Sequence, residues 1–589
     1  MDAMTPDQRL IGDLGRIVPG LFGQEAPLQL QPTNPEFEGT HTLVCFPITR
    51  VSRKSPEETA RLIGEELVRS SVVERFNVVK GFLNLVLSDA TWVEYFNGTL
   101  ADPGFGSFPS NGREIMVEYS SPNTNKPLHL GHLRNNFLGY SVAQLYAAIG
   151  YKVHRVQIIN DRGIHICKSM AAWQLTAEGE TPASSGMKGD HLVGKYYVVF
   201  DRMFREQVSG LIAQGLEKEQ AEKEAPVMKQ AVSLLQRWES KDPEVLDLWR
   251  TMNGWVYEGF SATYKRMGVE FDRLYYESDT YLLGKDEVIK GVQDGVFFQK
   301  PDGSVWVDLT ADGLDQKVLL RSDGTSVYMT QDIGTAILRF RDFPSIEGQI
   351  YTVGNEQEYH FQVLFLILRK LGFSWAEKCF HLSYGMVDLP SGRMKSREGT
   401  VVDADDLMEE MTQAAAAQSR ELGKAEPSPE LDEMVGLGAL KYFLLKVDPK
   451  KRMLFDPQES IQLQGNTGPF IQYTHARICA LLRKAEEQQI GLTGDAAPEA
   501  LEAAERSVIR LLGRYPQVVS DAAKAHSPAL VASYAYELAR EYNQFYQSIR
   551  IFGESDPIRF KFRLLLSARV SATIKKALDL LGIGAPEKM

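Results

Sequence analysis

The sequence predicts an α/β protein with three parts: a small α+β N-terminal domain, a central domain on a parallel sheet, and an all-helical C-terminal domain. Three observations support this prediction. A strand–helix–strand pattern spans residues 115–159, a long, charged helical stretch covers 186–272, and almost everything beyond Asp456 has helical periodicity. We expect residues 186–272 to be a helical insertion in the sheet domain.

The strand–helix–strand pattern begins with the apolar run Ile115–Tyr119 and continues in a helix whose apolar residues recur at spacings of three and four. Gly150 is well placed to end that helix, and Tyr151–Ile159 is typical of the next strand. Two strands joined by one helix form a βαβ unit. We therefore predict a Rossmann-like parallel sheet, with a ligand site beyond the carboxyl ends of its strands.

Composition and spacing set the domain boundaries. The Gly/Ser/Pro-rich stretch Gly104–Gly112 is expected to be a loop that closes an N-terminal domain of residues 1–112. The sheet domain should then cover 113–400, a connecting segment 401–455, and the helical domain 456–589. Within the sheet domain we also expect short strands at Val305–Val307 and Gln349–Val353, and a helix from Tyr359 to Leu371.

The bulk properties of the 589 residues are those of an ordinary globular protein. The longest apolar run, Val363–Leu368, is far shorter than the roughly 20 residues of a membrane span. Residues 1–6 have neither the basic nor the apolar region of a secretory signal. The four cysteines are widely separated and form no CxxC pair, which argues against a zinc ribbon or a disulfide framework. We expect a cytoplasmic protein without membrane contact.

The net charge of −12 does not favour a nucleic-acid partner, although RNA can bind part of a large surface. The tail from Gln547 to Met589 differs, with eight Lys or Arg against four acids. On charge alone, the favoured interpretation of this tail is a solvated helical face.

The most specific motif is Lys126-Pro-Leu-His129-Leu-Gly131-His132, at the junction between the first strand and the helix of the βαβ unit. A helix N-terminus offers unpaired N–H groups and a positive dipole end, so it attracts phosphate. Two histidines three apart could hydrogen-bond a triphosphate, and Gly131 would let a flat ring approach the backbone. The motif alone is weak, but its placement predicts that Lys126, His129, Gly131 and His132 bind ATP.

A second basic motif lies downstream, at Gly392–Thr400, where Lys395, Ser396 and Arg397 combine two cations with a hydroxyl. This chemistry suits a clamp that neutralises a departing pyrophosphate. Taken alone, the segment would be an ordinary basic turn.

Together the two motifs resemble the paired signatures of class I aminoacyl-tRNA synthetases. Three further segments resemble the arginine-specific members: Val117–Asn123 through Leu133-Arg-Asn135, Leu463–Arg477, and the ending Pro586–Met589. Lys80–Asn84 extends the resemblance more loosely to the N-terminal domain. The family's loop signature is Lys-Met-Ser-Lys-Ser, and here Arg397 stands in the second lysine position. Arginine enzymes with an altered loop carry a compensating lysine before the histidine motif, where Lys126 stands.

The resemblance implies ATP-dependent charging of tRNA(Arg) with L-arginine through an arginyl-adenylate, with Mg²⁺ accompanying ATP and no dedicated protein cage for the metal. It implies that the helical domain binds the anticodon. The implied residue roles are three. Glu277, Tyr328 and Asp332 would contact the guanidinium; Asn123, Gln357 and Ser121 would hold the α-amino and carboxylate groups; Asn84, Tyr473, Arg477 and Met589 would contact tRNA.

Residue chemistry supports part of this assignment. Guanidinium is a planar, permanently charged fork of donors, so its pocket needs carboxylates in fixed geometry. Tyr328 and Asp332 are four apart and would share a face if their segment is helical. Two roles stay open: Glu118 touches substrate or only orients its neighbours, and His165 binds ribose or phosphate or supports its loop.

Three alternatives remain at this stage. Small nucleotidyltransferases share the histidine junction but lack a helical tail. An inactive tRNA-binding paralogue would not need Lys126, His129, His132 and Asp332 intact. A glutamate or glutamine synthetase would favour cations over Glu277 and Asp332. We expect a monomer.

Overall fold

The computed structural model describes residues 5–34, 36–388, 390, 402–421 and 428–589. Its centre is a five-stranded parallel sheet in the order β12-β11-β5-β6-β7. The strands are β5 (Glu114–Glu118), β6 (Lys152–Ile159), β7 (Arg273–Tyr276), β11 (Ile346–Gly354) and β12 (Cys379–Tyr384). The chain order reverses between β5 and β11, and this reversal opens a ligand crevice at the carboxyl edge. The predicted Rossmann-like sheet is confirmed.

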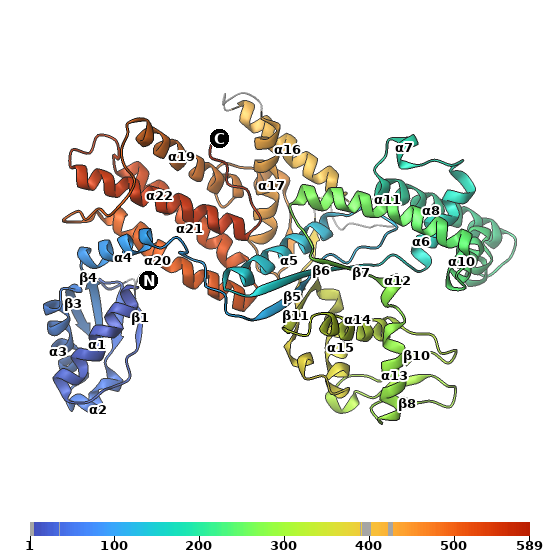
Figure 1. The fold of residues 1–589 in the computed structure, drawn as a ribbon, viewed down its shortest axis with the longest axis horizontal. Coiled ribbons are helices and arrows are strands. Elements are labelled where there is room, and N and C mark those ends of the chain that lie inside the picture. Colours follow the sequence, from blue (N-terminus) through green and yellow to red (C-terminus); the bar gives the residue numbers. More distant parts are fainter. Residues whose placement is uncertain (1–4, 35, 389, 391–401, 422–427) are drawn as a thin grey trace.

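The predicted βαβ unit is β5, α5 (Leu130–Ala148) and β6, with Gly150 at φ +89° just beyond the helix. Alternate side chains of β5 serve opposite faces of the sheet. Val117 joins the core that includes α5, whereas Met116 packs with Phe340 of α14 (Tyr328–Asp342). Helices therefore cover both faces, with α15 (Glu358–Lys370) packed beside β12 (Figure 1).

The helical insertion predicted at residues 186–272 is present between β6 and β7, but its helices begin earlier, with α6. Its helices are α6 (Ile164–Thr176), α7 (Pro182–Ser185), α8 (Gly189–Ala213), α9 (Lys218–Glu224), α10 (Pro226–Glu239) and α11 (Pro243–Met267). The long helices α8 and α11 pack on each other and project away from the sheet (Figure 1).

A second excursion, which the sequence patterns did not separate, leaves the sheet between β7 and α14. It holds α12 (Glu277–Thr280), α13 (Leu283–Gln293), and an antiparallel sheet of β8 (Phe298–Gln299), β9 (Val305–Val307) and β10 (Lys317–Leu320). The expected strand at Val305–Val307 is thus confirmed, but it belongs to this small sheet. Val288, Val307 and Leu319 form part of a separate core beneath it.

The N-terminal domain is α+β, as expected. Its antiparallel sheet runs β1-β2-β4-β3, with β1 (Leu30–Pro32), β2 (His41–Val44), β3 (Val73–Val79) and β4 (Phe82–Leu87). The helices are α1 (Pro6–Phe22), α2 (Thr49–Ser52), α3 (Pro56–Arg69) and α4 (Asp89–Ala101). Helix α4 docks on the C-terminal helices, where Phe96 meets Phe562 edge to face at 5.2 Å.

The domain predicted at 456–589 is helical, as expected, with α18 (Pro457–Ser460), α19 (Gly468–Glu487), α20 (Ala503–Ala525), α21 (Ala529–Ser548) and α22 (Pro557–Leu580). The predicted connecting segment 401–455 also contains regular structure: α16 (Ala404–Glu421), α17 (Pro429–Leu445) and β14 (Met453–Leu454), which pairs with β13 (Val387–Asp388). No helix in the described part of the chain is long and apolar enough to cross a membrane.

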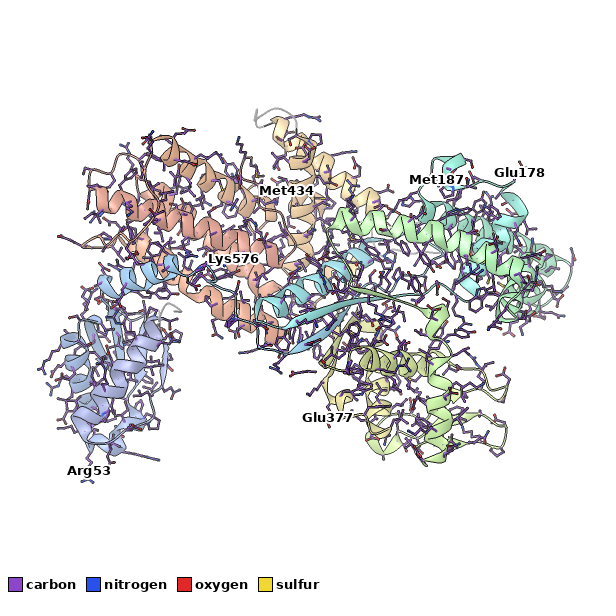
Figure 2. The ribbon with its side chains drawn as sticks, in the orientation of Figure 1. Arg53, Glu178, Met187, Glu377, Met434 and Lys576 are labelled. Carbon is purple, nitrogen blue, oxygen red and sulfur yellow. The ribbon has the colours of Figure 1, made fainter. Side chains whose placement is uncertain are left out.

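The basic tail is not simply a solvated helical face, so that interpretation is wrong for three of its cations. Arg563 is buried and pairs with Glu505 at 2.6 Å and Glu554 at 2.7 Å. Arg569 donates to the Thr99 carbonyl, and Lys576, labelled in Figure 2, donates to the Phe105 carbonyl at 2.8 Å. Because these groups bond within the protein, they fasten α22 to its neighbours instead of forming an RNA surface.

Candidate functional site

The predicted site residues gather at the carboxyl edge of the central sheet. The segment after β5 carries Asn123 and the histidine motif, and Glu277 follows β7 directly. Gln357 follows β11 and is exposed. Asn123 pairs with Asn160, which follows β6, so the first two strand ends are joined through their backbones. One edge of the sheet therefore presents all four segments.

Backbone hydrogen bonds fix the tautomer of both histidines in the motif. His129 is the N-cap of α5, and its Nδ1 accepts the Gly131 N–H at 3.1 Å. The Nδ1 of His132 accepts the His129 N–H at 3.1 Å. Since a ring nitrogen that accepts carries no proton, each neutral imidazole keeps its proton on Nε2. Burial, aided by Lys126, lowers the pKa of His129 to about 3, and burial lowers that of His132 as well. The motif thus offers two neutral Nε2–H donors.

Gly131 and Lys126 complete this phosphate-binding geometry. A Cβ on Gly131 would lie 3.0 Å from Cε1 of the His129 ring, so a larger residue would crowd that ring. Burial lowers the pKa of Lys126. No carboxylate among the described residues contributes to this shift of the Lys126 pKa, so its ammonium is available for an anion.

A short backbone ladder borders the histidine motif. Leu130 N–H donates to the Val402 carbonyl at 3.2 Å, and Ala404 N–H donates to the Leu128 carbonyl at 2.9 Å. Lys395, Ser396 and Arg397 lie outside the described residues. The chain that follows them, at Val402, runs beside the motif that they were predicted to assist.

Two carboxylates mark the other part of the site. Glu277 begins α12 with its side chain 15% exposed, and its nearest cation is Arg162, 3.9 Å away. Burial raises the pKa of Glu277 to about 7; Arg162 opposes this rise, and Asp161 and Asp332 add to it. A carboxyl group whose charge is this costly is suited to a cationic ligand.

Asp332 lies in the first turns of α14, one turn after Tyr328, so the predicted helical face is confirmed. The Tyr328 side chain is exposed. His360 of α15 places its Nε2 2.6 Å from the Asp332 carboxylate. His360 was not predicted, because nothing in the local spacing links it to a residue on a different helix.

Asp161 is a second residue that the sequence patterns did not single out. Its buried carboxylate accepts hydrogen bonds from Ser278 N–H at 2.9 Å, the Ser278 hydroxyl at 2.7 Å and Tyr257 at 2.9 Å. These bonds tie the end of β6 to α12 and so position Glu277. The available signal was its place directly after a predicted strand.

The two open roles can now be described by their contacts. Glu118 is buried and pairs with the equally buried Arg339 of α14, so it links β5 to the helix that carries Tyr328 and Asp332. His165 lies in the first turn of α6 with its Nδ1 3.2 Å from the Tyr197 hydroxyl of α8. Both contacts are within the protein, and both residues connect elements around the site.

The residues predicted to contact tRNA occupy two different settings. Asn84 is 2% exposed, and its amide bonds to Thr42 at 2.6 Å and Asn77 at 2.8 Å. Because this buried amide is bonded to both neighbouring strands, we do not include Asn84 in a proposed RNA surface. On α19, the Arg477 guanidinium lies 4.8 Å from the Tyr473 ring.

The C-terminal residues are fastened to α19. The Pro586 carbonyl lies 2.9 Å from His475 Nδ1, and the Glu587 carbonyl accepts from Arg483 at 3.0 Å. Met589 packs against the main core. The C-terminal segment that resembles the family's ending is therefore bonded to α19, the helix that carries Tyr473 and Arg477.

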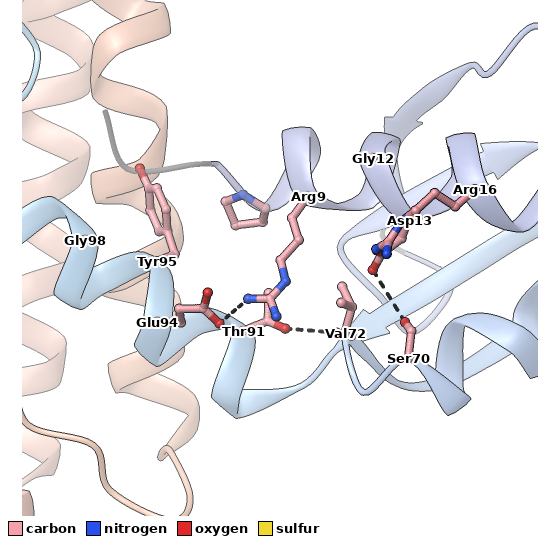
Figure 3. A pocket seen from close by; sticks show the side chains of 11 residues that line it. Arg9, Gly12, Asp13, Arg16, Ser70, Val72, Thr91, Glu94, Tyr95 and Gly98 are labelled. Carbon is pink, nitrogen blue, oxygen red and sulfur yellow. Dashed lines mark hydrogen bonds and ion pairs between the residues drawn. The ribbon is translucent and has the colours of Figure 1, made fainter. Parts of the chain in front are cut away.

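A cavity of about 790 Å³ lies elsewhere, in the N-terminal domain between α1 and α4 (Figure 3). Its two arginines are neutralised, because Arg9 pairs with Glu94 and Arg16 pairs with Asp13. With no excess charge and no histidine or cysteine in its lining, it offers less chemistry than the sheet edge.

Comparisons with known proteins agree with this geometry. A family model for the class I (R) tRNA synthetase catalytic domain matches residues 103–456, and one for the DALR anticodon-binding domain matches 471–589. An arginine–tRNA ligase from Flavobacterium psychrophilum is 55% identical over 95% of this chain and 96% of its own length. One from Bacteroides thetaiotaomicron is 53% identical over the full length of both. The solved structure of Thermus thermophilus arginyl-tRNA synthetase superposes with a TM-score of 0.78 at 26% identity, covering 99% of this chain and 100% of its own. The chain belongs to the arginyl-tRNA synthetase family of class I aminoacyl-tRNA synthetases.

Proposed function

We propose that this protein attaches L-arginine to tRNA(Arg) at the expense of ATP, through an arginyl-adenylate, with release of AMP and pyrophosphate. The observation that carries the proposal is the pair of carboxylates Glu277 and Asp332 beside the nucleotide motif. Burial is the main cause of the raised pKa of Glu277, and Asp332 adds a smaller contribution, so a guanidinium beside both carboxylates would be favourable to each of them.

In the first step, the arginine carboxylate attacks the α-phosphate of ATP and the bond to pyrophosphate breaks. The Nε2–H groups of His129 and His132 and the charge of Lys126 would stabilise the phosphates as negative charge develops. Lys395, Ser396 and Arg397 are proposed to share this task around the departing pyrophosphate.

Mg²⁺ is proposed to enter with the ATP triphosphate and not to reside in a protein cage. Among the described residues, the group best spaced for a metal is Asp190, His191 and Asp405. The Lys188 ammonium already lies against both of its carboxylates, 3.1 Å from Asp190 and 2.5 Å from Asp405. An ammonium in that position competes with a metal ion.

The amino acid is proposed to lie between the two motifs. Tyr328, Glu277 and Asp332 would bind its guanidinium. Ser121, Asn123 and Gln357 would hold its α-amino and carboxylate groups, which keeps the reacting oxygen near the histidines. No protein nucleophile is required, since orientation and charge stabilisation supply the catalysis.

In the second step, the terminal ribose hydroxyl of the tRNA attacks the adenylate carbonyl and AMP leaves. We propose that Tyr473, Arg477 and Met589 contact the anticodon, because unpaired bases stack on flat or polarisable groups. Action in the cytoplasm as a monomer remains a prediction.

The test is to offer each of the twenty amino acids with ATP and total tRNA and to measure which becomes acylated. We expect arginine alone to be attached. Charging with another amino acid, or RNA binding without charging, would overturn the proposal.

A further inference from the structure

A charge cluster connects the helical insertion to the segment that borders the histidine motif. Lys188, at the N-terminus of α8, donates to Asp190 at 3.1 Å, to Asp405 of α16 at 2.5 Å, and to Thr263 of α11. Thr263 also donates to Asp405 at 3.0 Å. Residues of two helices of the insertion therefore bond to one carboxylate in the first turn of α16.

The same turn of α16 is joined to the nucleotide motif. Asp403 caps α16, accepting the Asp405 N–H at 2.8 Å, and its backbone pairs with that of His129. Ala404 and Val402 complete the ladder with Leu128 and Leu130. A displacement of Asp405 would therefore move segment 402–404, which is hydrogen-bonded beside the N-cap residue His129.

Burial and hydrogen bonds fix the carboxylates at both ends of this charge cluster, Asp190 in α8 and Asp405 in α16. Asp190 is fully buried, and burial raises its pKa. Burial opposes ionisation of Asp405 too, but hydrogen bonds from His191 and Lys188 hold its pKa below the usual range. Helix α8 also lies close to the motif, since a Cβ at Gly194 would come within 2.8 Å of Pro127. Such dense contact leaves little freedom between the insertion and the motif.

We propose that Lys188 and Asp405 are positioning residues of the arginylation reaction, whose ion pair holds segment 402–404 and thereby the two histidine donors in register with ATP. This gives the helical insertion a role in adenylate formation. The inference rests on the proposed function. It requires no contact between Lys188 or Asp405 and substrate, so their removal should affect the rate of the chemical step and not arginine binding.

The test compares Lys188→Met and Asp405→Asn with a matched control, Lys195→Met. Lys195 is on the same helix and pairs with Glu180 at 2.6 Å, and among the described residues neither partner forms an ion pair with α16. ATP–pyrophosphate exchange is measured with tRNA(Arg) present, together with the thermal midpoint of each variant. A misplacement of about 1 Å can cost on the order of 100-fold in rate. We expect kcat to fall at least about tenfold in both variants, with arginine KM within about twofold of the parent.

Three further results complete the design. Lys188→Arg should recover much of the lost rate, because it restores the charge, and Lys195→Met should match the parent. If Lys188→Met does not fold, Asp405→Asn, which keeps its shape, decides alone. Parent kcat in folded Asp405→Asn, with only a lower thermal midpoint, would show a purely structural pair and overturn the inference. A parent protein that does not activate arginine at all would instead overturn the proposed function and this inference with it.

Discussion

Glu277→Gln should remove a pH dependence that the proposed arginine site predicts for arginine recognition. The pKa of Glu277 is about 7 in the free protein, and its ionised form is the one that attracts a guanidinium. About nine tenths of the molecules are ionised at pH 8 and about one tenth at pH 6. The kcat/KM for arginine should therefore fall about tenfold between these pH values. Glutamine cannot ionise, so the variant should show a flat profile across this range at a lower level.

The same substitution should change stability in the opposite direction. Because the folded-state pKa lies above the ordinary value, the folded protein holds its proton more tightly than the unfolded chain, and stability is lost as the pH rises through 7. The difference between about 7 and the ordinary 4.5 corresponds to about 3 kcal/mol as an upper value. Glu277→Gln should thus raise the free energy of unfolding at pH 8 while it impairs arginine use.

The assay is aminoacylation at limiting arginine from pH 6 to 8, with denaturant unfolding at pH 8. Asp279→Asn is the matched control, since Asp279 is exposed on the same short helix. It should retain the parent profile. A parent profile that is flat in this range, or one that Glu277→Gln leaves unchanged, would refute the assignment of Glu277 to the guanidinium.

Four further predictions concern other parts of the account. Asp332→Asn should raise the KM for arginine and leave ATP affinity unchanged; because the Asp332 side chain is 42% exposed in the free protein, the cost should fall below the about 2–5 kcal/mol of a fully buried pair, and unaltered arginine kinetics would contradict the pocket. Lys126→Ala and Arg397→Ala should each lower kcat of activation, and their double mutant should be non-additive, whereas strict additivity would mean independent roles. From the family resemblance, ATP–pyrophosphate exchange should be weak without tRNA and should appear when tRNA(Arg) is added; robust exchange without RNA would refute this. Tyr473→Ala, or removal of the last four residues, should weaken tRNA charging by about 1–3 kcal/mol per lost base contact without affecting arginine or ATP binding, and charging equal to the parent's would exclude both from anticodon contact.

The features that the sequence predicted well are those with local periodicity. Helix α5 and strand β6 were placed within a residue or two, because their apolar spacing and Gly150 are read within a single window. The histidine motif was predicted for the same reason: its geometry depends on neighbours three apart at a helix start. The strands β7 and β12 were missed, because each is defined by pairing with a strand that is distant in sequence, and β7 is also only four residues long.

The side-chain contacts around the site could not be predicted from local patterns. The pairs Glu118–Arg339 and Asp332–His360 each join two separate elements, and only the fold brings them together. In the basic tail, the local charge pattern likewise failed to predict which side chains are buried. Its charge count is that of a solvated face, yet Arg563 is buried against Glu505, because burial depends on the packing of α20 and α22.

The central claim is that Glu277 and Asp332 select a permanently charged guanidinium, and the charging of tRNA(Arg) with arginine and with citrulline tests it most directly. Citrulline has nearly the same shape but a neutral urea group, so only the charge and its donors differ. The account predicts arginine charging and a kcat/KM for citrulline at least about 1,000-fold lower, consistent with the loss of a charged partner at two carboxylates. Comparable charging of both amino acids would contradict it.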